Sequence, residues 1–329
     1  MLKKSTLEHL KLSKNLLAFS AGSDSSALFF MLLEQGIAFD IAMVDYGVRE
    51  QSKQEAEYAK KLSCMYDKEL FLKKAPKLEG SFEKEAREFR YEFFKEVIQK
   101  HNYTTLITAH HLGDMFEWFL MQLSKGAGLA EIVGSKEIED MGSFTLIKPL
   151  LYTPKSKIDE YLKTENIKHF IDETNSDTTF KRNYFRKRFA EDFLAEYEEG
   201  VKRSLEYLAL DKELFFTTDS LLDIKNLSLI ASKNDRVDIY NIDRCLKKLG
   251  ILASKEQRDE ILKQKDCVVA GKVAVVFEDD VIFIAPYVKI PIDKEIRDKL
   301  RVMKIPPKIR GYITDEGISL EVLKEVLLC

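Results

Sequence analysis

The chain has 329 residues, 45% of them hydrophobic, and a formal net charge of −3 at pH 7. This length predicts two domains, and the hydrophobic content is enough to form buried cores. The small net charge argues against nucleic-acid binding through overall positive charge, so a nucleic-acid site would need a local cluster of Lys and Arg. The 4 cysteines form no C-x-x-C pair, which gives no support for a disulfide framework, a zinc ribbon or an iron–sulfur cluster. No segment resembles a membrane span or a secretion signal, so we expect a cytoplasmic protein.

The first half of the chain alternates between apolar runs and amphipathic segments. Strands are expected at 16–20, 40–45, 69–72, 105–109 and 145–147. Helices are expected between them, at 25–35, 52–65, 81–100 and 113–124. This alternation predicts a parallel sheet with helices on both faces. Ligands of such sheets bind beyond the carboxyl ends of the strands.

The pattern changes to helix, loop and helix from about residue 151. A polar stretch at 172–179 precedes a basic run, and a small α+β region is expected from about residue 206. Its predicted elements are helices at 236–248 and 255–264 and a hairpin over 268–286 that turns near Asp279 and Asp280. The tail from residue 290 holds several prolines and a single helix candidate.

The first chemical motif follows the first predicted strand. Small and hydroxylated residues at 20–25 interrupt an apolar run that then resumes at helical spacing, which indicates a strand, a phosphate loop and a helix. Small residues let the backbone approach an anion, and the start of a helix presents free amides with a favourable dipole. A triphosphate fits this description. An ordinary turn capped by Ser23 or Asp24 would explain the same pattern.

The second motif lies at the end of another predicted strand. Asp114 and Glu117 are three residues apart, so on a helix they share one face near its N-terminus. Two carboxylates there could hold Mg²⁺, or could simply complement the helix dipole. His110 could contact a phosphate or fill the end of the strand.

The third motif is a run of five cations over residues 181–188. On a helix, Arg182 and Arg186 lie at i and i+4 with Asn183 beside them, which would form an anion clamp. Arg87 and Arg90 also lie at helical spacing. A solvated basic face would explain either set of arginines.

Taken together and in this order, the motifs resemble those of the tRNA(Ile)-lysidine synthetases, a family of the PP-loop (N-type) ATP pyrophosphatase superfamily. The resemblance rests on segments at 20–25, 86–91, 110–117, 126–131, 147–151 and 172–175 with 182–186. The lysine-rich segment at 298–310 resembles part of the family's C-terminal region, with a shorter sequence after it. Three positions depart from the family pattern. Gly113 and Trp118 stand where the family has Asp and Thr, and Ala21 replaces a glycine of the loop, which predicts a backbone there that is not left-handed.

The resemblance implies an α/β fold with a parallel-sheet, Rossmann-like PP-loop nucleotide-binding domain, a helical linker and a small α+β C-terminal domain. The implied boundaries are 1–205 for the catalytic domain, 206–289 for the α+β domain and 290–329 for a short basic tail. The implied cofactors are ATP, bound by Ser20, Ala21, Gly22, Ser23, Asp24 and Ser25, and Mg²⁺, bound by Asp114 and Glu117. The implied catalytic residues are Asp24, His110, Arg182 and Arg186. The implied RNA contacts are Arg87, Arg90, Arg182, Asn183, Arg186 and Arg188.

The resemblance also implies the reaction and the partners. The protein would join free L-lysine to C2 of the wobble cytidine in the isoleucine tRNA with a CAU anticodon, through an adenylated cytidine. A homodimer is one option for its assembly, and no membrane partner is expected. Three alternatives remain at this point: a PP-loop tRNA thiolase, an amidotransferase-linked ligase, and an RNA-binding relative without catalysis. The scattered cysteines disfavour the thiolase, since such enzymes usually carry paired cysteines.

Overall fold

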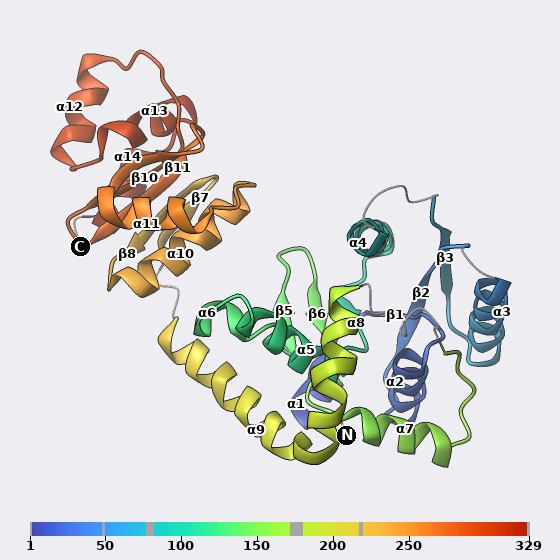
Figure 1. The fold of residues 1–329 in the computed structure, drawn as a ribbon. Helices are drawn as coiled ribbons and strands as arrows, with labels where there is room; N and C mark the ends of the chain where they lie inside the picture. Colours follow the sequence, from blue (N-terminus) through green and yellow to red (C-terminus); the bar gives the residue numbers. More distant parts are fainter. Residues whose placement is uncertain (1, 48–49, 77–81, 172–179, 217–219, 328–329) are drawn as a thin grey trace. The chain divides into compact units, whose positions relative to one another are not determined.

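A computed structural model describes residues 2–47, 50–76, 82–171, 180–216 and 220–327 (Figure 1). The chain forms two compact units, Met1–Leu210 and Asp211–Cys329. The predicted polar stretch at 172–179 lies outside the described residues.

The N-terminal unit is built on a six-stranded sheet in the order β3-β2-β1-β4-β6-β5. Its strands are β1 (Asn15–Ala18), β2 (Phe39–Asp45), β3 (Leu70–Lys74), β4 (Thr105–Ile107), β5 (Ile138–Asp140) and β6 (Thr145–Ile147). All neighbouring pairs are parallel except β5 with β6. The mostly parallel sheet and the five expected strands are thereby confirmed, whereas the short edge strand β5 was not anticipated. The central position of β1 places the loop after it in the middle of the sheet's carboxyl edge.

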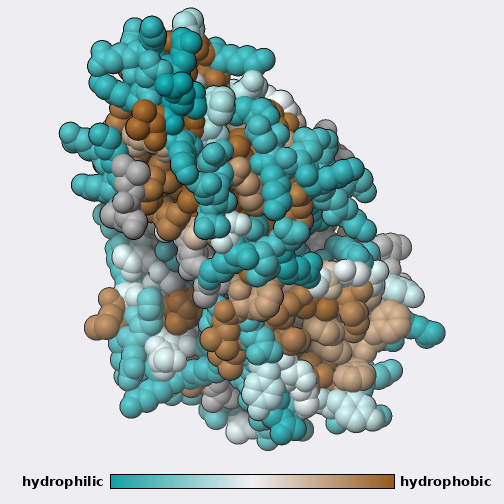
Figure 2. Space-filling model, turned by 90° about the vertical axis from the view of Figure 1, so that its left-hand side faces the viewer, coloured by the Kyte–Doolittle hydropathy of each residue, from teal (hydrophilic) through white to brown (hydrophobic). Residues whose placement is uncertain are grey.

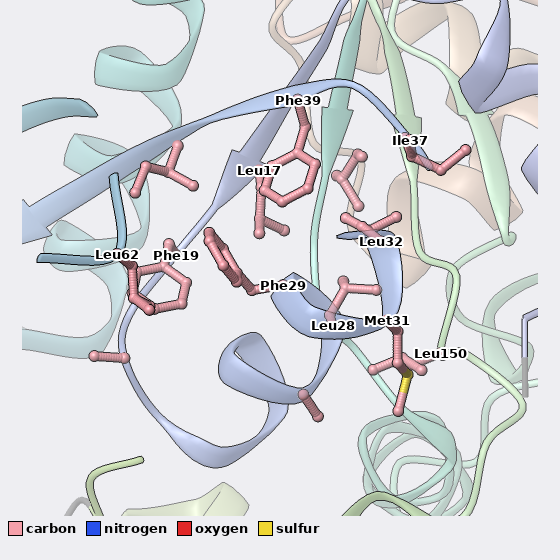
Figure 3. Packing of buried hydrophobic residues seen from close by; sticks show 14 of the residues in the cluster. Leu17, Phe19, Leu28, Phe29, Met31, Leu32, Ile37, Phe39, Leu62 and Leu150 are labelled. Carbon is pink, nitrogen blue, oxygen red and sulfur yellow. The ribbon is translucent and has the colours of Figure 1, made fainter. Parts of the chain in front are cut away.

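Adjacent residues of β1 point to opposite faces of the sheet and define two cores. Leu17 packs with α2 (Ser23–Glu34), α3 (Glu50–Met65) and α7 (Lys155–Thr164), whereas Leu16 packs with α4 (Phe82–His101) on the other face. Phe29 of α2 stands edge-on to Phe39, with ring centroids 5.2 Å apart, at the centre of the first core (Figure 3). The covered faces explain why the central strands β1, β2 and β4 are apolar at most positions.

A third core joins the helices that flank the carboxyl edge. Leu112, Met115 and Phe116 of α5 (Leu112–Leu123) pack with Ala190 and Val201. The latter two residues belong to the successive elements α8 (Lys181–Phe185), the π-helical turn η2 (Arg186–Ala190) and α9 (Glu191–Phe215), and α9 is kinked at Tyr197. The remaining helices of this unit are α1 (Lys4–Lys11) and α6 (Leu129–Ile132). The third core therefore fixes the basic run of the sequence against α5.

The C-terminal unit is a five-stranded antiparallel sheet in the order β7-β8-β11-β10-β9. Its strands are β7 (Ser220–Ile224), β8 (Leu227–Ala231), β9 (Asp266–Val269), β10 (Val273–Glu278) and β11 (Val281–Pro286). Its helices are α10 (Asp235–Lys248), α11 (Lys255–Gln264), α12 (Lys294–Val302), α13 (Pro307–Asp315) and α14 (Leu320–Leu327). Helices α10 and α11 cover one face, and α12 to α14 contribute to the core of the other.

Two expectations for this unit change. The predicted hairpin does turn at Asp279 and Asp280, but its first residues form the separate strand β9. Between residues 290 and 327 the tail holds three helices instead of one, because Leu300, Ile309 and Leu323 all pack into the core of the sheet. The predicted domain boundaries at residues 205 and 289 stay predictions.

The surface is mixed in character. Figure 2 shows hydrophobic residues gathered over parts of a face that is otherwise largely hydrophilic. Within the described ranges, no helix combines the length and the hydrophobicity that crossing a membrane requires.

Two glycines provide a matched test of packing. A Cβ atom at Gly311 of α13 would lie 2.0 Å from the carbonyl oxygen of Val288, whereas a Cβ at Gly200 of α9 would meet nothing within 4 Å. We therefore expect Gly311→Ala to destabilise the C-terminal unit by about 1–3 kcal/mol. Gly200→Ala should be neutral or stabilising by up to about 1 kcal/mol.

Hydrogen exchange followed by mass spectrometry measures this effect, because it reports on the two units separately. Faster exchange of β10 and β11 is expected in Gly311→Ala alone. Equal exchange in both variants would show that α13 does not pack closely against Val288.

Candidate functional site

The loop after β1 is organised by Ser25, the third residue of α2. The Ser25 hydroxyl accepts a hydrogen bond from the amide of Ser20 (3.2 Å), lies 3.1 Å from the Ser20 hydroxyl and donates to the carbonyl of Gly22 (3.2 Å). Helix α2 starts at Ser23, and its N-cap Gly22 makes no side-chain capping bond. The amides of the first helical turn thus face outward without a side-chain cap, which is the arrangement that binds phosphate.

The backbone of the loop corrects one expectation. Ala21 adopts a left-handed conformation with φ of 61°, although the sequence predicted that it would not. Ala21 is fully buried, its carbonyl accepts a hydrogen bond from the amide of Phe170 (2.9 Å), and Gly22 forms a β-bridge to Phe170. These tertiary contacts outweigh a conformational cost of about 1–2 kcal/mol for a residue with a Cβ.

Asp24 of the loop is paired with Lys155, which the sequence analysis missed. The Lys155 ammonium donates to Asp24 Oδ1 (2.6 Å) and to the Ser23 hydroxyl (2.7 Å) from the first turn of α7. The only local signal for this residue was the proline before it, which marks the start of a helix. Lys155 places a positive charge directly beside the phosphate loop.

His111, the neighbour of the predicted His110, links the loop to the second motif. Its Nε2 lies 3.9 Å from Asp24 Oδ2 and 3.8 Å from Asp114 Oδ2. Its ring also caps α5 by accepting from the amide of Gly113 (3.0 Å), while Asp114 accepts from the His111 amide (2.8 Å). A Cβ at position 113 would lie 2.7 Å from the ring, so the departure to glycine makes room for this cap.

The other departure, Trp118, has a structural role. The Trp118 indole donates to the carbonyl of Glu131 (3.2 Å), and a Cβ at Gly134 would lie 2.8 Å from the ring. Trp118 therefore joins α5 to α6 and to the residues that follow it, outside the chemistry of the site.

Both predicted arginines reach the predicted carboxylates. Arg182 donates to Asp114 and, through Nε, to Glu117 Oε2 (2.6 Å); Arg186 donates through Nε to Glu117 Oε1 (2.5 Å) and through Nη2 to Glu117 Oε2 (3.2 Å). The Glu117 side chain is only 3% exposed. A buried carboxylate held by two guanidinium groups is a strong and directional interaction. The spacing of Arg182 and Arg186 thus forms a clamp, but its anion is Glu117.

The arrangement of Asp114 and Glu117 does not fit the expected Mg²⁺ site. Both oxygens of Glu117 accept from arginines, and the two oxygens of Asp114 accept from Arg182 and the His111 amide. A metal ion would share these oxygens with positively charged arginines, which disfavours cation binding. Across the described part of the chain, no group of three or more His, Cys, Asp or Glu is placed to hold a metal.

The charges around the site shift the pKa values of two groups. Burial raises the pKa of Asp114, but His111 and Arg182 lower it more strongly. The pKa of this carboxyl group therefore lies well below its usual range, and the group is ionised at pH 7. Burial lowers the pKa of His110 to about 4, with Lys148, Arg182 and Arg87 acting in the same direction. His110 is therefore neutral at pH 7, and the Thr108 hydroxyl lies 2.9 Å from its Nδ1.

These groups surround one cleft at the carboxyl edge of the sheet. Predicted residues that line it are Ser20, Gly22, Asp24, Ser25, Arg87, Arg90, His110 and Asp114. Arg182 reaches the cleft through its bond to Asp114. Arg188 is exposed and is not among the lining residues. The phosphate loop, Asp114 and Arg182 thus converge on one cleft, which is the geometry that a nucleotide-activating enzyme needs.

Comparisons with known proteins agree with this fold and site. The PP-loop domain family matches residues 2–192, which places the chain in the class of PP-loop proteins. The U34-tRNA thiolase NcsA from Methanococcus maripaludis with its 4Fe-4S cluster has a TM-score of 0.50 at 17% identity, over 62% of this chain and 78% of that one. At that identity, the similarity shows the fold alone.

Relatives that match over nearly the whole length define the family more closely. The tRNA(Ile)-lysidine synthase of Campylobacter jejuni (strain RM1221) is 42% identical over 98% of this chain and 99% of the relative. The tRNA(Ile)-lysidine synthase of Wolinella succinogenes is 40% identical over 95% and 96%. The chain belongs to the tRNA(Ile)-lysidine synthase family.

The lowered pKa of His110 makes a prediction about stability. Between pH 6.5 and about 4 the unfolded chain takes up a proton at this position while the folded chain does not, so acid favours unfolding. Lowering the pH from 7 to 5 should cost about 2 kcal/mol through His110 alone. His110→Gln should remove this part of the pH dependence. Urea unfolding of both proteins at the two pH values measures it, and parallel pH profiles would contradict a neutral, half-buried His110.

Proposed function

We propose that this chain ligates L-lysine to the wobble cytidine of the isoleucine tRNA with a CAU anticodon, using ATP. The main support is that the phosphate loop, Asp114 and Arg182, which donates to Asp114, meet at one cleft. The relatives that match this chain over nearly its whole length are named tRNA(Ile)-lysidine synthase. The cytosine C2 oxygen attacks the α-phosphate of ATP and pyrophosphate leaves. The lysine ε-amine then displaces AMP at C2, which gives lysidine.

The phosphate loop and Lys155 supply the groups that bind ATP. The first-turn amides of α2 are suited to phosphate oxygens, and the Lys155 ammonium is held beside them by Asp24 and Ser23. Positive charge at this point stabilises the departing pyrophosphate. Mg²⁺, which screens phosphate charge in many ATP-using enzymes, stays a prediction without assigned ligands, and no step here depends on it.

The lysine nucleophile must lose a proton before it forms a bond. At pH 7 an amine with a pKa near 10.4 is mostly protonated, at a cost of roughly 4–5 kcal/mol. His110 is neutral, but a base with a pKa of about 4 is too weak to deprotonate an ammonium group in the ground state. That first proton is therefore lost to water, at the cost given above. His110 is better suited to accept the second proton, which the amine loses as the new C–N bond makes it acidic. We propose that role for His110.

RNA recognition is assigned to local basic groups. Arg87 and Arg90 of α4 line the cleft, which supports a role in contacting phosphates of the nucleotides around the target cytidine. A base in a loop can be unstacked and inserted into a cleft at modest cost. Asn183 and Arg188 remain proposed RNA contacts on the segment that carries the arginine pair.

The alternatives are less well supported. Named relatives at high coverage favour lysidine synthesis over thiolation, and the similarity to the thiolase concerns the fold alone. The proposed homodimer and the cytoplasmic location stay predictions.

Incubation of the protein with ATP, labelled lysine and total tRNA tests the proposed reaction. We expect label in a single species, the isoleucine tRNA with a CAU anticodon, with release of AMP and pyrophosphate. Methionine tRNA in a parallel reaction should stay unlabelled. No labelled tRNA, or label in methionine tRNA, would overturn the proposal.

Arg182→Ala should separate catalysis from RNA binding. Because Arg182 is fixed at Asp114 and Glu117, its loss should lower kcat by about 10²–10³-fold and change the tRNA dissociation constant only a few-fold. Arg188→Ala is the contrasting variant: Arg188 is exposed on the same segment and is a proposed RNA contact, so its loss should weaken tRNA binding more than it lowers kcat. Single-turnover kinetics and filter binding measure the two effects. Equal losses in Arg182→Ala would make this residue an RNA contact only.

A further inference from the structure

The segment that carries the arginine pair also exposes a cluster of aromatic rings. Tyr184, Phe185 and Phe189, here called the aromatic platform, lie with ring centroids 5.6–6.0 Å apart. Tyr184 is 46% exposed and Phe189 is 45% exposed. Large aromatic side chains at this exposure forgo burial of apolar area, so an exposed cluster of them indicates a contact surface.

The π-helical turn explains how these rings meet. Tyr184 and Phe189 are five residues apart, and η2 begins at Arg186 between them. A π-helix brings residues five apart onto one side, where an α-helix brings together those three or four apart. Their edge-to-face contact has an interplanar angle of 77°. Arg182 and Arg186 are engaged with Glu117, so the segment provides both the buried ion pairs and the exposed platform.

The charge around the platform is strongly positive. Residues 180–190 contain five cations and no acid. The Lys181 ammonium lies 5.9 Å from the centroid of the Phe185 ring, and Lys181, Lys187 and Arg188 are exposed. Exposed aromatic rings among cations are the combination that binds single-stranded nucleic acid, because the rings stack on bases while the cations meet phosphates.

We infer that the aromatic platform stacks on an unpaired base of the tRNA anticodon loop, next to the nucleotide that enters the cleft. This inference rests on the proposed function and deepens it by assigning the RNA-binding surface. Tyr184 is two residues from both Arg182 and Arg186, so its ring projects from the opposite side of the helix, about one helix diameter (~10 Å) from the arginines at the cleft. An unpaired loop nucleotide next to the target cytidine can span that distance. A second copy of the chain is a poorer occupant, because twofold pairing of this segment would set the exposed cations Lys181, Lys187 and Arg188 against the same three.

Substitution of the platform tests the assignment. The variants are Tyr184→Ala, Phe189→Ala and the double substitution, with Tyr207→Ala of α9, 64% exposed, as the matched control. The probe is the isoleucine tRNA anticodon stem-loop with 2-aminopurine beside the wobble position. We expect the double substitution to weaken binding at least tenfold and to abolish the fluorescence quenching that stacking causes. ATP binding and thermal stability should match those of the control variant.

Phe189→Leu distinguishes stacking from general hydrophobic packing, because leucine keeps most of the apolar volume without a ring. If stacking causes the quenching, Phe189→Leu should show little or none of the quenching that Phe189→Ala loses. Full recovery in the Phe189→Leu variant, or unchanged affinity and quenching in the double variant, would overturn the platform. Loss of a dimer without loss of RNA affinity would also overturn it, in favour of self-association.

The two proposals can fail separately. If the wild-type protein labels the tRNA while the platform variants bind RNA normally, only the platform is wrong. If the wild-type protein binds no tRNA, both proposals are wrong.

Discussion

The site depends on one buried carboxylate. Glu117 is held between Arg182 and Arg186, and it lies on α5 while the arginines lie on α8 and η2. Burial raises the cost of leaving any of the three without a partner, so breaking such a cluster typically costs about 3–5 kcal/mol. Burial lowers the pKa of Arg186, but Glu117 raises it more, so the guanidinium stays charged. The ion pairs therefore anchor the basic segment to the edge of the sheet.

The same interaction continues through the cleft. Asp114 lies one turn before Glu117 on α5 and accepts from Arg182, and His111 connects Asp114 to Asp24 of the phosphate loop. Segments that are distant in sequence are joined in this way into one chain of polar contacts: Lys155, Asp24, His111, Asp114, Arg182, Glu117 and Arg186. A nucleotide bound at the loop and an RNA base beside the basic segment would meet in a preorganised site.

The sequence predicted features that are encoded locally. Strands and helices of the N-terminal unit follow hydrophobic periodicity, and the phosphate loop follows from small residues after an apolar strand. The spacing of Asp114 and Glu117 does not distinguish metal ligands from partners of an arginine, since only the fold shows which groups face them. Lys155 lies 131 residues from its partner Asp24, which no local pattern reports. The left-handed backbone of Ala21 could not be predicted from the low propensity of alanine for that conformation, because tertiary contacts with Phe170 determine it.

A double-mutant cycle in the free energy of unfolding between Glu117 and Arg186 tests the central claim most directly. Glu117→Gln, Arg186→Gln and the double variant are compared with the wild type by urea unfolding. If Glu117 holds the basic segment, the two substitutions should be strongly non-additive, with a coupling of about 1–3 kcal/mol. Additive effects would show that the ion pair does not organise the site.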